Sequence, residues 1–358
     1  MRIAIDLFAG AGGLSLGLTR AGFTIVAAVE INKHASSTYK KNHKNLSDLC
    51  FNEDIRNLKP HKFLDRIGIY KNEIDLIAGG PPCQGFSMAN GRSRLISNPK
   101  NEFVHDFVRW IEQIKPRAFL MENVKGFEQI DGGALVNDLL QRFIEIGYRN
   151  TIKLSLDAVN YGVPQHRKRI FLIGTLNGEL LLEPAKLYDN KEKRFLTVGD
   201  AIIGDLPKIH PLPGENVTKY YNEPQSKYQK KIRGKIKTLH NHITTNCDKK
   251  IIEKFSWIKQ GENWTAIKDR IGIKVQYSSL YKRLDEEKPS ITMSNYRKSM
   301  IIHPRENRLL SVREAARLQS FPDNYIFEGG ISSMQQQVGD AVPPLLAKEV
   351  AKIIIESL

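Results

Sequence analysis

The chain has 358 residues, of which 41% are hydrophobic, and its formal net charge is +15 from 54 Lys and Arg against 39 Asp and Glu. This length and composition are typical of a globular protein of about two domains, and they argue against a disordered or fibrous chain. No window approaches the length of a membrane span, and the N-terminus MRIAIDLFAGAGG resembles neither a signal peptide nor a transit peptide. We therefore expect a soluble, cytoplasmic protein.

In chain order, the first 180 residues alternate short apolar runs with amphipathic stretches, which is the pattern of βαβ units in a parallel, doubly wound sheet. The expected strands are Arg2–Leu7, Thr24–Val29, Asp75–Ala78, Ala118–Met121, Thr151–Leu156 and Arg169–Gly174. The expected helices are Leu14–Ala21, Ala35–Asn42, Glu102–Ile114 and Ala134–Ile146. The fold class that follows is α/β.

From about residue 180 to 300 the alternation fades and basic residues accumulate. Residues 181–300 hold 24 Lys and Arg against 14 Asp and Glu, a net of +10. Within them, the segment 219–237 (KYYNEPQSKYQKKIRGKIK) combines seven basic residues with three tyrosines. Charge interleaved with aromatic rings suits nucleic acid, although such runs also occur on ordinary solvated surfaces. We expect a smaller, loop-rich domain here.

Recognisable secondary-structure patterns reappear in the last 50 residues. Ser311 and Glu314 have the spacing of a capping box at the start of a helix that runs through Arg317, and a final helix is expected from about Pro344 to Glu356. The expected domains are therefore a catalytic domain at 1–180, a basic recognition domain with its hinge at 181–325, and a segment at 326–358 that returns to the first domain.

The first strand runs through a glycine turn into a helix, so backbone N–H groups and the positive helix end face any ligand there. The dinucleotide pattern GxGxxG requires a glycine where Ser15 stands, which disfavours a nicotinamide cofactor. Glu30 ends the second apolar strand, where a carboxylate can accept hydrogen bonds from both ribose hydroxyls, and Asp54 follows where another βα turn is expected. Together these residues indicate a nucleoside pocket without a pyrophosphate site.

Cysteine usage leaves one thiol of special interest. Cys50, Cys83 and Cys247 form no CxxC pair, so neither a disulfide framework nor a structural zinc site is expected. Cys83 lies in GGPPCQGFS (79–87) after an apolar run. An isolated cysteine in such a turn is more often a core residue than a nucleophile, so its role depends on the rest of the chain.

Eight motifs in order resemble the DNA (cytosine-5) methyltransferase family, in its bacterial restriction-modification form. They are DLFAGAGG (6–13), VEIN (29–32), EDI (53–55), GGPPCQGFS (79–87), MENVKG (121–126), YGVPQHRKRIFLIG (161–174), SVREAARLQSFPD (311–323) and VGDAVPP (338–344). The resemblance implies a Rossmann-like methyltransferase sheet with a second, smaller DNA-recognition domain. It also implies methyl transfer from S-adenosylmethionine to carbon 5 of a cytosine flipped out of a specific duplex DNA sequence.

By the same resemblance, one group of residues forms the cofactor site. The residues around the methionine end are Phe8, Gly10, Gly12, Gly13 and Leu14. Glu30 would bind the ribose, Ile31 and Ile55 would enclose the adenine, Asp54 would accept from its amino group, and Pro82 would lie near the sulfonium. Asp340 is implied as a further contact, although this motif commonly reads GNAVPP, with asparagine where Asp340 stands.

The catalytic residues implied are Cys83, Glu122 and Arg167. A thiolate that adds to cytosine carbon 6 makes carbon 5 nucleophilic, and Glu122 would bind N3 and the exocyclic amine. Arg167 would contact the cytosine O2 and steady Glu122, whereas Arg169 is expected to support the structure.

The implied partner is double-stranded DNA, with a cognate restriction endonuclease acting separately, and we expect a nucleoid-associated monomer with no metal ion. The candidate DNA contacts are Gln84, Ser87, Arg92, Arg94, Lys230, Lys231 and Arg233. Three alternatives remain open at this point: a tRNA cytosine-5 methyltransferase on the same core, a catalytically silent DNA-binding regulator, and a nicotinamide oxidoreductase.

Overall fold

The computed structural model describes residues 1–82, 102–177, 182–191, 193–209, 213–271, 279–294, 296 and 298–358. The chain divides into two compact units. The first comprises Met1–Asp157, Lys168–Ala185 and Leu346–Leu358, and the second comprises Ala158–Arg167 and Lys186–Leu345. Whether these units correspond to catalytic and recognition domains stays a prediction.

The first unit is built on a seven-stranded sheet with the order β3-β2-β1-β4-β5-β7-β6. Its strands are β1 (Arg2–Leu7), β2 (Phe23–Val29), β3 (Cys50–Phe51), β4 (Leu76–Gly79), β5 (Ala118–Val124), β6 (Asn150–Asp157) and β7 (Lys168–Thr175). The six strands expected from the sequence are all present, and β3 is additional. The α/β class is confirmed, but the sheet is not wholly parallel, because β7 runs antiparallel between β5 and β6.

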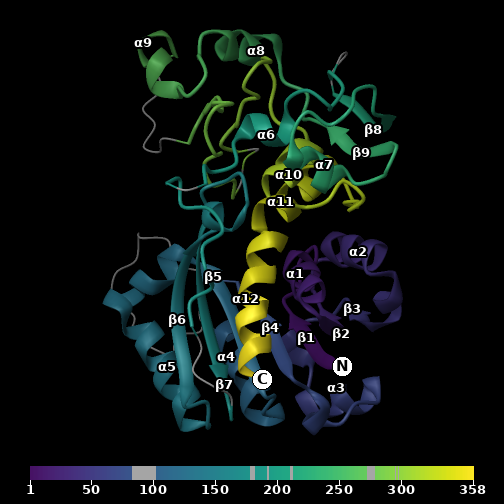
Figure 1. The fold of residues 1–358 in the computed structure, drawn as a ribbon, viewed down its shortest axis with the longest axis vertical. Helices are drawn as coiled ribbons and strands as arrows, with labels where there is room; N and C mark the ends of the chain where they lie inside the picture. The colour runs from purple at the N-terminus through teal and green to yellow at the C-terminus, as the bar shows by residue number, and fades with distance from the viewer. Residues whose placement is uncertain are drawn as a thin grey trace. The chain divides into compact units, whose positions relative to one another are not determined.

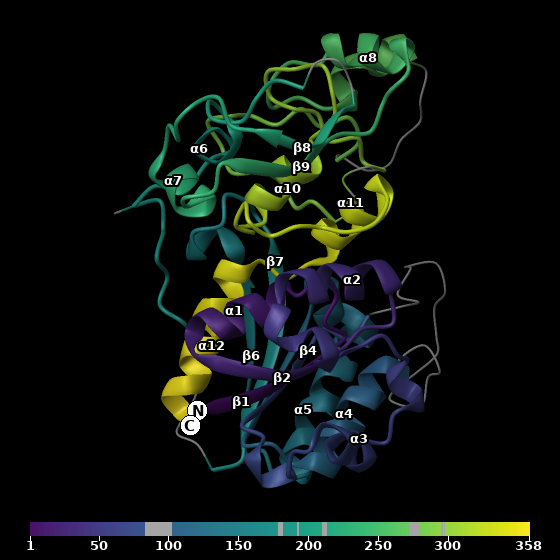
Figure 2. The ribbon, with the colours of Figure 1, turned by 90° about the vertical axis from the view of Figure 1, so that its right-hand side faces the viewer.

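Helices cover both faces of this sheet (Figures 1 and 2). The helices are α1 (Gly13–Ala21), α2 (Lys33–Asn42), α3 (Pro60–Ile67), α4 (Glu102–Ile114), α5 (Ala134–Glu145) and α12 (Pro344–Ser357). Phe63 of α3, Trp110 of α4 and Phe143 of α5 belong to one apolar core with the sheet. On the other face α1 and α12 touch so closely that a Cβ at Gly17 would lie 2.3 Å from that of Ala347. Short 3-10 turns complete the unit: η1 (Lys44–Leu49), η2 (Ile55–Asn57), η3 (Lys71–Glu73) and η5 (Lys125–Gly133).

The second unit contains short elements joined by long connections. They are η6 (Ala158–Tyr161), α6 (Val198–Ile202), β8 (Gly214–Lys219), α7 (Lys227–Arg233), β9 (Thr238–Ile243), α8 (Lys249–Ser256), η7 (Trp264–Ile267), α9 (Lys268–Ile271), α10 (Val312–Leu318) and α11 (Ile331–Asp340). Strands β8 and β9 form an antiparallel pair. The capping box between Ser311 and Glu314 is confirmed at the start of α10. None of the helices in the described ranges is both long and apolar enough to cross a bilayer.

Buried ion pairs accompany the apolar core of the second unit. Arg317, fully buried in α10, donates to both carboxylate oxygens of Asp205, at 2.6 and 2.9 Å, and to Asp323 at 2.6 Å. Tyr220 donates its hydroxyl proton to the same Asp323 at 2.6 Å, and Tyr228 of α7 donates to the Arg317 carbonyl at 2.6 Å. These bonds hold three parts of the unit together: the loop after α6, the segment 219–237 and α10.

A buried histidine in this unit makes stability depend on pH. Nδ1 of His303 accepts from the backbone N–H groups of Arg305 and Glu306, at 3.2 and 3.1 Å, so protonating Nδ1 would break both bonds. Burial accordingly lowers the pKa of His303 to about 4. Because the unfolded chain takes up this proton near pH 6.5 and the folded chain does not, stability is fully present above pH 6.5 and is lost as the pH falls toward 4.

We expect this loss to reach roughly 3 kcal/mol of unfolding free energy. Denaturant unfolding between pH 7 and 4, followed in the second unit by hydrogen exchange, measures it. His303→Gln should flatten the profile, whereas replacement of the exposed His34 should leave it unchanged. A His303→Gln profile as steep as that of the wild type would contradict the assignment.

Candidate active site

The carboxyl end of β1 leads into a strained turn, residues 8–12, which we call the glycine turn. Phe8, Gly10 and Gly12 all have positive φ, at 58°, 55° and 86°, and α1 begins at Gly13. A Cβ placed on Gly10 would meet no atom within 4 Å, so the turn faces open space. A glycine with open space in front of it lets a ligand approach the backbone closely, so the turn fits the methionine end of the expected cofactor.

Glu30 is fixed beside this turn. Its Oε2 accepts from Gly10 N at 2.8 Å, and its Oε1 accepts from Asn32 N at 2.7 Å. The glycine turn expected at the methionine end and the acid expected at the ribose are therefore in direct contact. Leu14 is buried behind the turn, whereas Phe8 is half-buried and lies edge-on to Phe103, with ring centroids 5.9 Å apart.

Ser15, the residue that breaks the dinucleotide pattern, has a structural partner. Its Oγ donates to Oδ2 of the fully buried Asp6 at 2.5 Å, and it lies 2.7 Å from the Tyr39 hydroxyl of α2. Burial raises the pKa of Asp6 to about 7. A glycine at position 15 would remove this link between β1, α1 and α2, which explains why serine stands here.

The purine end of the expected site combines an exposed and a buried isoleucine. Ile31 is 60% exposed and Ile55 only 4% exposed. Asp54 caps η2, and its carboxylate accepts from the Arg56 backbone N–H and side chain. Asn52, two residues before Asp54, donates to the Ile31 carbonyl at 2.9 Å, so the two segments are attached to each other. A carboxylate and an exposed apolar side chain on such segments suit a purine with its exocyclic amine.

Pro82 is exposed just after β4, and it is the last described residue before position 83. Cys83, Gln84, Ser87, Arg92 and Arg94 lie outside the described residues. Their roles stay predictions from the sequence.

The strands β4 and β5 bring two expected motifs together. Glu122 is 8% exposed near the end of β5, and a Cβ on Gly80 would lie 3.0 Å from its Oε2. The next residue, Asn123, donates to the Pro81 carbonyl at 3.1 Å. The backbone that leads into Cys83 is therefore attached directly to the strand that carries Glu122.

Arg169 lies against Glu122. Its Nε is 2.8 Å from Oε1, and both side chains are at most 10% exposed, although the N–H direction does not align as a hydrogen bond. The register explains the contact, because Arg169 pairs with Val124 across the antiparallel strands and is the diagonal neighbour of Glu122. The sequence interpretation expected structural support from Arg169, and it missed this contact because strand pairing is not visible in the motif.

Arg167 is fully buried in the second unit. It donates to the Met293 carbonyl at 3.3 Å and to the Gly339 carbonyl at 2.6 Å. Gly339 itself is required by close packing, because a Cβ there would lie 1.9 Å from the Ser294 carbonyl oxygen. The contact with cytosine that the resemblance assigns to Arg167 stays a prediction.

We expect Glu122→Gln to lower kcat by at least about a hundredfold, because an amide has no acidic proton to share with N3, where addition of the thiolate to carbon 6 places negative charge. Arg169→Gln should lower kcat about tenfold by releasing the carboxylate. Single-turnover methyl transfer measures both, at a temperature well below the melting temperature of each variant, because removing one partner of this buried pair also destabilises the fold. Cofactor affinity should be unchanged. The control is Arg117→Gln, which removes the ion pair between the exposed Arg117 side chain and the buried Asp75; equal losses in Arg117→Gln and Arg169→Gln would show that orientation of Glu122 is not the cause.

The remaining predicted contacts lie in the second unit. Asp340 is exposed at the end of α11 and accepts from Gln336 at 2.7 Å. Lys230 and Lys231 are exposed on α7. Arg233 is largely enclosed: its guanidinium lies 3.9 Å from the centre of the Tyr220 ring and donates to the Asn222 carbonyl at 2.6 Å, which favours a supporting position beneath the lysines.

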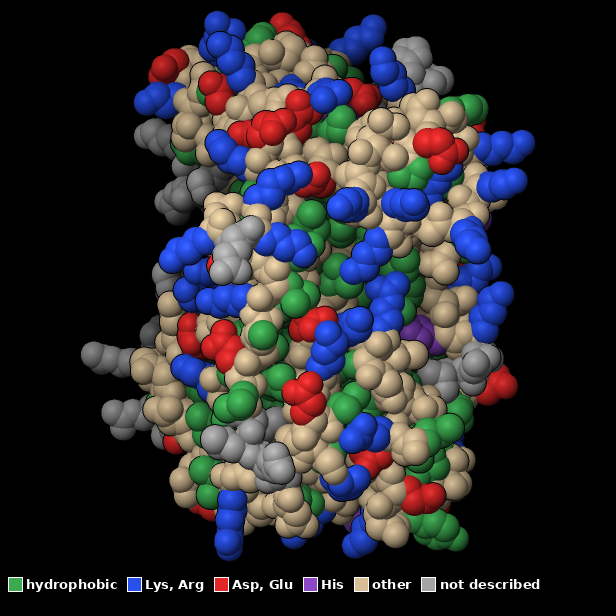
Figure 3. Space-filling model, viewed as in Figure 1, with side chains coloured by type: hydrophobic (Ala, Val, Ile, Leu, Met, Phe, Trp, Pro, Cys, Tyr) green, Lys and Arg blue, Asp and Glu red, His purple; other side chains and the backbone are tan. Residues whose placement is uncertain are grey.

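Six lysines of the segment 219–237 are exposed, and its single acid is Glu223. They are Lys219, Lys227, Lys230, Lys231, Lys235 and Lys237. Figure 3 shows how widely Lys and Arg side chains are spread over one face of the molecule. This segment therefore has the charge of a surface that binds a polyanion.

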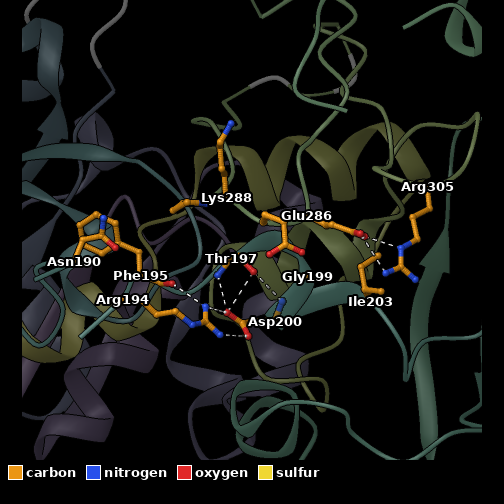
Figure 4. A pocket seen from close by; sticks show the side chains of 12 residues that line it. Asn190, Arg194, Phe195, Thr197, Gly199, Asp200, Ile203, Glu286, Lys288 and Arg305 are labelled. Atoms are coloured by element: carbon orange, nitrogen blue, oxygen red, sulfur yellow. Dashed lines mark hydrogen bonds and ion pairs between the residues drawn. The ribbon is translucent and has the colours of Figure 1, made fainter. Parts of the chain in front are cut away.

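A pocket of about 560 Å³ lies within the second unit and contains none of the predicted site residues. Its arginines are already paired: Arg194 makes two bonds to Asp200, at 2.7 and 3.0 Å, and Arg305 makes two to Glu286, at 2.6 and 3.3 Å (Figure 4). Because these cations are matched by carboxylates, the pocket is not a site for a polyanion.

The family model for C-5 cytosine-specific DNA methylases matches residues 3–356. The chain belongs to this family. It is therefore a DNA cytosine-5 methyltransferase, as the ordered motifs indicated.

Individual relatives agree with this assignment. The chain is 36% identical to the Type II methyltransferase M.DdeI of Desulfomicrobium norvegicum, over 98% of this chain and 88% of that protein. It is 35% identical to the Type II methyltransferase M1.HphI of Haemophilus parahaemolyticus, over 98% and 86%. A crystal structure of a prophage-encoded DNA modification methyltransferase from E. coli superposes with a TM-score of 0.77 at 28% identity, covering 99% of both chains. The methyltransferase fold is thereby confirmed.

Proposed function

We propose that this methyltransferase transfers a methyl group from S-adenosylmethionine to carbon 5 of a cytosine flipped out of a specific duplex DNA sequence, through a covalent Cys83 adduct. The observation that carries the proposal is the junction of β4 and β5. Glu122 is held by Arg169 and lies against Gly80, while Asn123 holds Pro81, two residues before the nucleophile. The backbone that leads to the proposed nucleophile is thus held to the strand that carries the proposed acid.

In the proposed reaction, the Cys83 thiolate forms a bond to cytosine carbon 6 while Glu122 binds N3 and the exocyclic amine. The ring becomes an enamine, and carbon 5 takes the methyl group. Loss of the carbon 5 proton to a base and departure of the thiolate then restore the aromatic ring. Unpairing and unstacking the base costs a few kcal/mol, which contacts with the DNA backbone offset.

The cofactor would supply an electrophilic methyl group on a sulfonium. We propose that the glycine turn (Phe8, Gly10, Gly12, Gly13, Leu14) holds its methionine end and that Glu30 accepts from the ribose hydroxyls. Asp54 accepts from the adenine amine between Ile31 and Ile55. The open space at Gly10 and the attachment of Glu30 to the same turn support this arrangement.

Bisulfite sequencing of DNA from cells that express the protein, beside cells that express a Cys83→Ser variant, tests the proposal. Methylated cytosines at one recurring sequence in the wild-type sample only are expected. Parallel assays on duplex DNA and tRNA separate the two nucleic-acid substrates. Methylation of tRNA alone would overturn the DNA assignment.

A DNA-binding role for the segment 219–237 predicts a salt-dependent loss of affinity. Each phosphate contact that is removed lowers the slope of log K against log salt by about one. The double variant Lys230→Gln, Lys231→Gln should therefore bind duplex DNA more weakly and with a slope smaller by about two. The exposed Lys71 and Lys115 of the first unit provide a control pair. An unchanged slope in the α7 variant would exclude these lysines from the interface.

A further inference from the structure

One arginine connects separate parts of the proposed cofactor site. Arg56 follows Ile55 in η2, and its side chain reaches Asp54 in three ways: Nε lies 3.0 Å from each carboxylate oxygen and Nη2 lies 2.6 Å from Oδ2. Its backbone N–H donates to Oδ1 at 3.0 Å. Asp54 is thereby held in one orientation.

The other side of Arg56 contacts the start of α4. Its Nη1 donates to Glu102 at 3.2 Å, and the guanidinium lies 5.3 Å from the centre of the Phe103 ring. That ring packs edge-on against Phe8 of the glycine turn. A single side chain therefore links the acid expected to recognise adenine with the aromatic pair beside the methionine end.

The N–H donors of Arg56 leave the Asp54 carboxylate able to accept one more hydrogen bond. A carboxylate has about four acceptor sites, and Arg56 directs three N–H groups at them: the backbone N–H to Oδ1, Nη2–H to Oδ2, and Nε–H shared between both oxygens. The remaining site can accept one proton from an exocyclic amine. Asp54 stays ionised for this purpose, since the side-chain hydrogen bonds of Arg56 lower its pKa.

We infer that Arg56 is a positioning residue for base recognition in the cofactor: it fixes the Asp54 carboxylate so that the one free acceptor site selects the adenine amine. The inference rests on the proposed function, because it requires the adenine beside Asp54. A hypoxanthine ring, with a carbonyl in place of the amine, would turn an acceptor toward this carboxylate and be rejected.

Loss of Arg56 should leave the fold intact. Its side chain is 42% exposed, and ion pairs at such positions contribute at most about 1 kcal/mol. Arg66 supplies a matched control, because it pairs with Glu53, the acid directly before Asp54, at 2.6 Å. Its guanidinium lies 4.4 Å from the centre of the Phe51 ring, and 52% of its side chain is exposed. Arg56→Gln and Arg66→Gln therefore remove the same kinds of contact from adjacent carboxylates.

The experiment is calorimetric titration of the full chain with S-adenosylhomocysteine and with S-inosylhomocysteine. The wild type should bind the adenosyl compound at least about tenfold more tightly, which corresponds to 1.4 kcal/mol. Arg56→Gln should reduce this preference to about threefold or less, mainly by weakening adenosyl binding. Arg66→Gln should keep the wild-type ratio, and Asp54→Ala should abolish the preference.

Two failures are distinguishable. If Asp54→Ala loses the preference while Arg56→Gln retains it, the positioning role of Arg56 is wrong and the adenine assignment stands. If the wild type itself binds both compounds equally, Asp54 does not recognise the amine, and both the assignment and this inference are overturned.

Discussion

Replacing Cys83 by serine is expected to lower methyl transfer by at least about a thousandfold while duplex DNA and cofactor remain bound. A free thiol has a pKa near 8.5, so a few per cent is thiolate at neutral pH, and nearby positive charge increases that fraction. A hydroxyl supplies almost no anion at this pH, so the bond to carbon 6 cannot form at a useful rate. Transfer of labelled methyl to duplex DNA and fluorescence anisotropy measure the two properties separately.

Cys247→Ser provides the control. That thiol is half-buried in the second unit and donates to the Thr245 carbonyl, so its replacement should leave turnover near the wild-type rate. A duplex with 5-fluorocytosine at the target should trap a covalent adduct with wild-type protein and with Cys247→Ser, but not with Cys83→Ser. Normal turnover in the Cys83→Ser variant would overturn the proposed mechanism.

The second large effect concerns stability. Arg317→Met should destabilise the second unit by about 3–5 kcal/mol, because the fully buried Asp205 and Asp323 lose the guanidinium that hydrogen-bonds both and keep the more distant Arg233 and Arg313, each at 3.9 Å. A melting-temperature decrease on the order of 10 °C is expected for a unit of this size. Hydrogen exchange of peptides from α6 and α10 locates the loss.

Arg305→Met is the matched control, because it removes an ion pair that is exposed instead of buried. Arg305 also pairs with a carboxylate, that of Glu286, but 58% of its side chain is exposed, so at most about 1 kcal/mol is expected. Similar losses in Arg305→Met and Arg317→Met would mean that the buried network does not hold the unit together. If Arg317→Met lowered the hydrogen-exchange protection of α10 alone, the buried network would stabilise that helix and not the whole unit.

The sequence predicted those parts of the fold that depend on local patterns. Alternating apolar runs located six strands of the first unit, and the spacing of Ser311 and Glu314 located the start of α10. The antiparallel place of β7 was not predictable, because periodicity marks a strand but not its neighbours. The contact of Arg169 with Glu122 depends on that strand order, and for this reason it was missed.

The second unit was harder to predict for a different reason. Sequence periodicity arises when a helix or strand buries an apolar face, whereas here Arg317 and its partners are buried through charge pairing. All seven residues of α10 are buried, so it has no polar face to alternate with an apolar one. The elements of this unit thus follow from contacts between residues as far apart as 205 and 317, which no local window contains.

The packing of Gly17 against Ala347 has a consequence for biosynthesis. Helix α12, which packs against α1, is encoded after the entire second unit, so it leaves the ribosome only after that unit has been made. Until then the surface of α1 around Gly17 has no covering helix, and the nascent first unit remains incomplete. Translational arrest just before Leu346 should therefore yield chains whose N-terminal half is sensitive to proteases and chaperone-bound, even though all seven strands of its sheet have already been made.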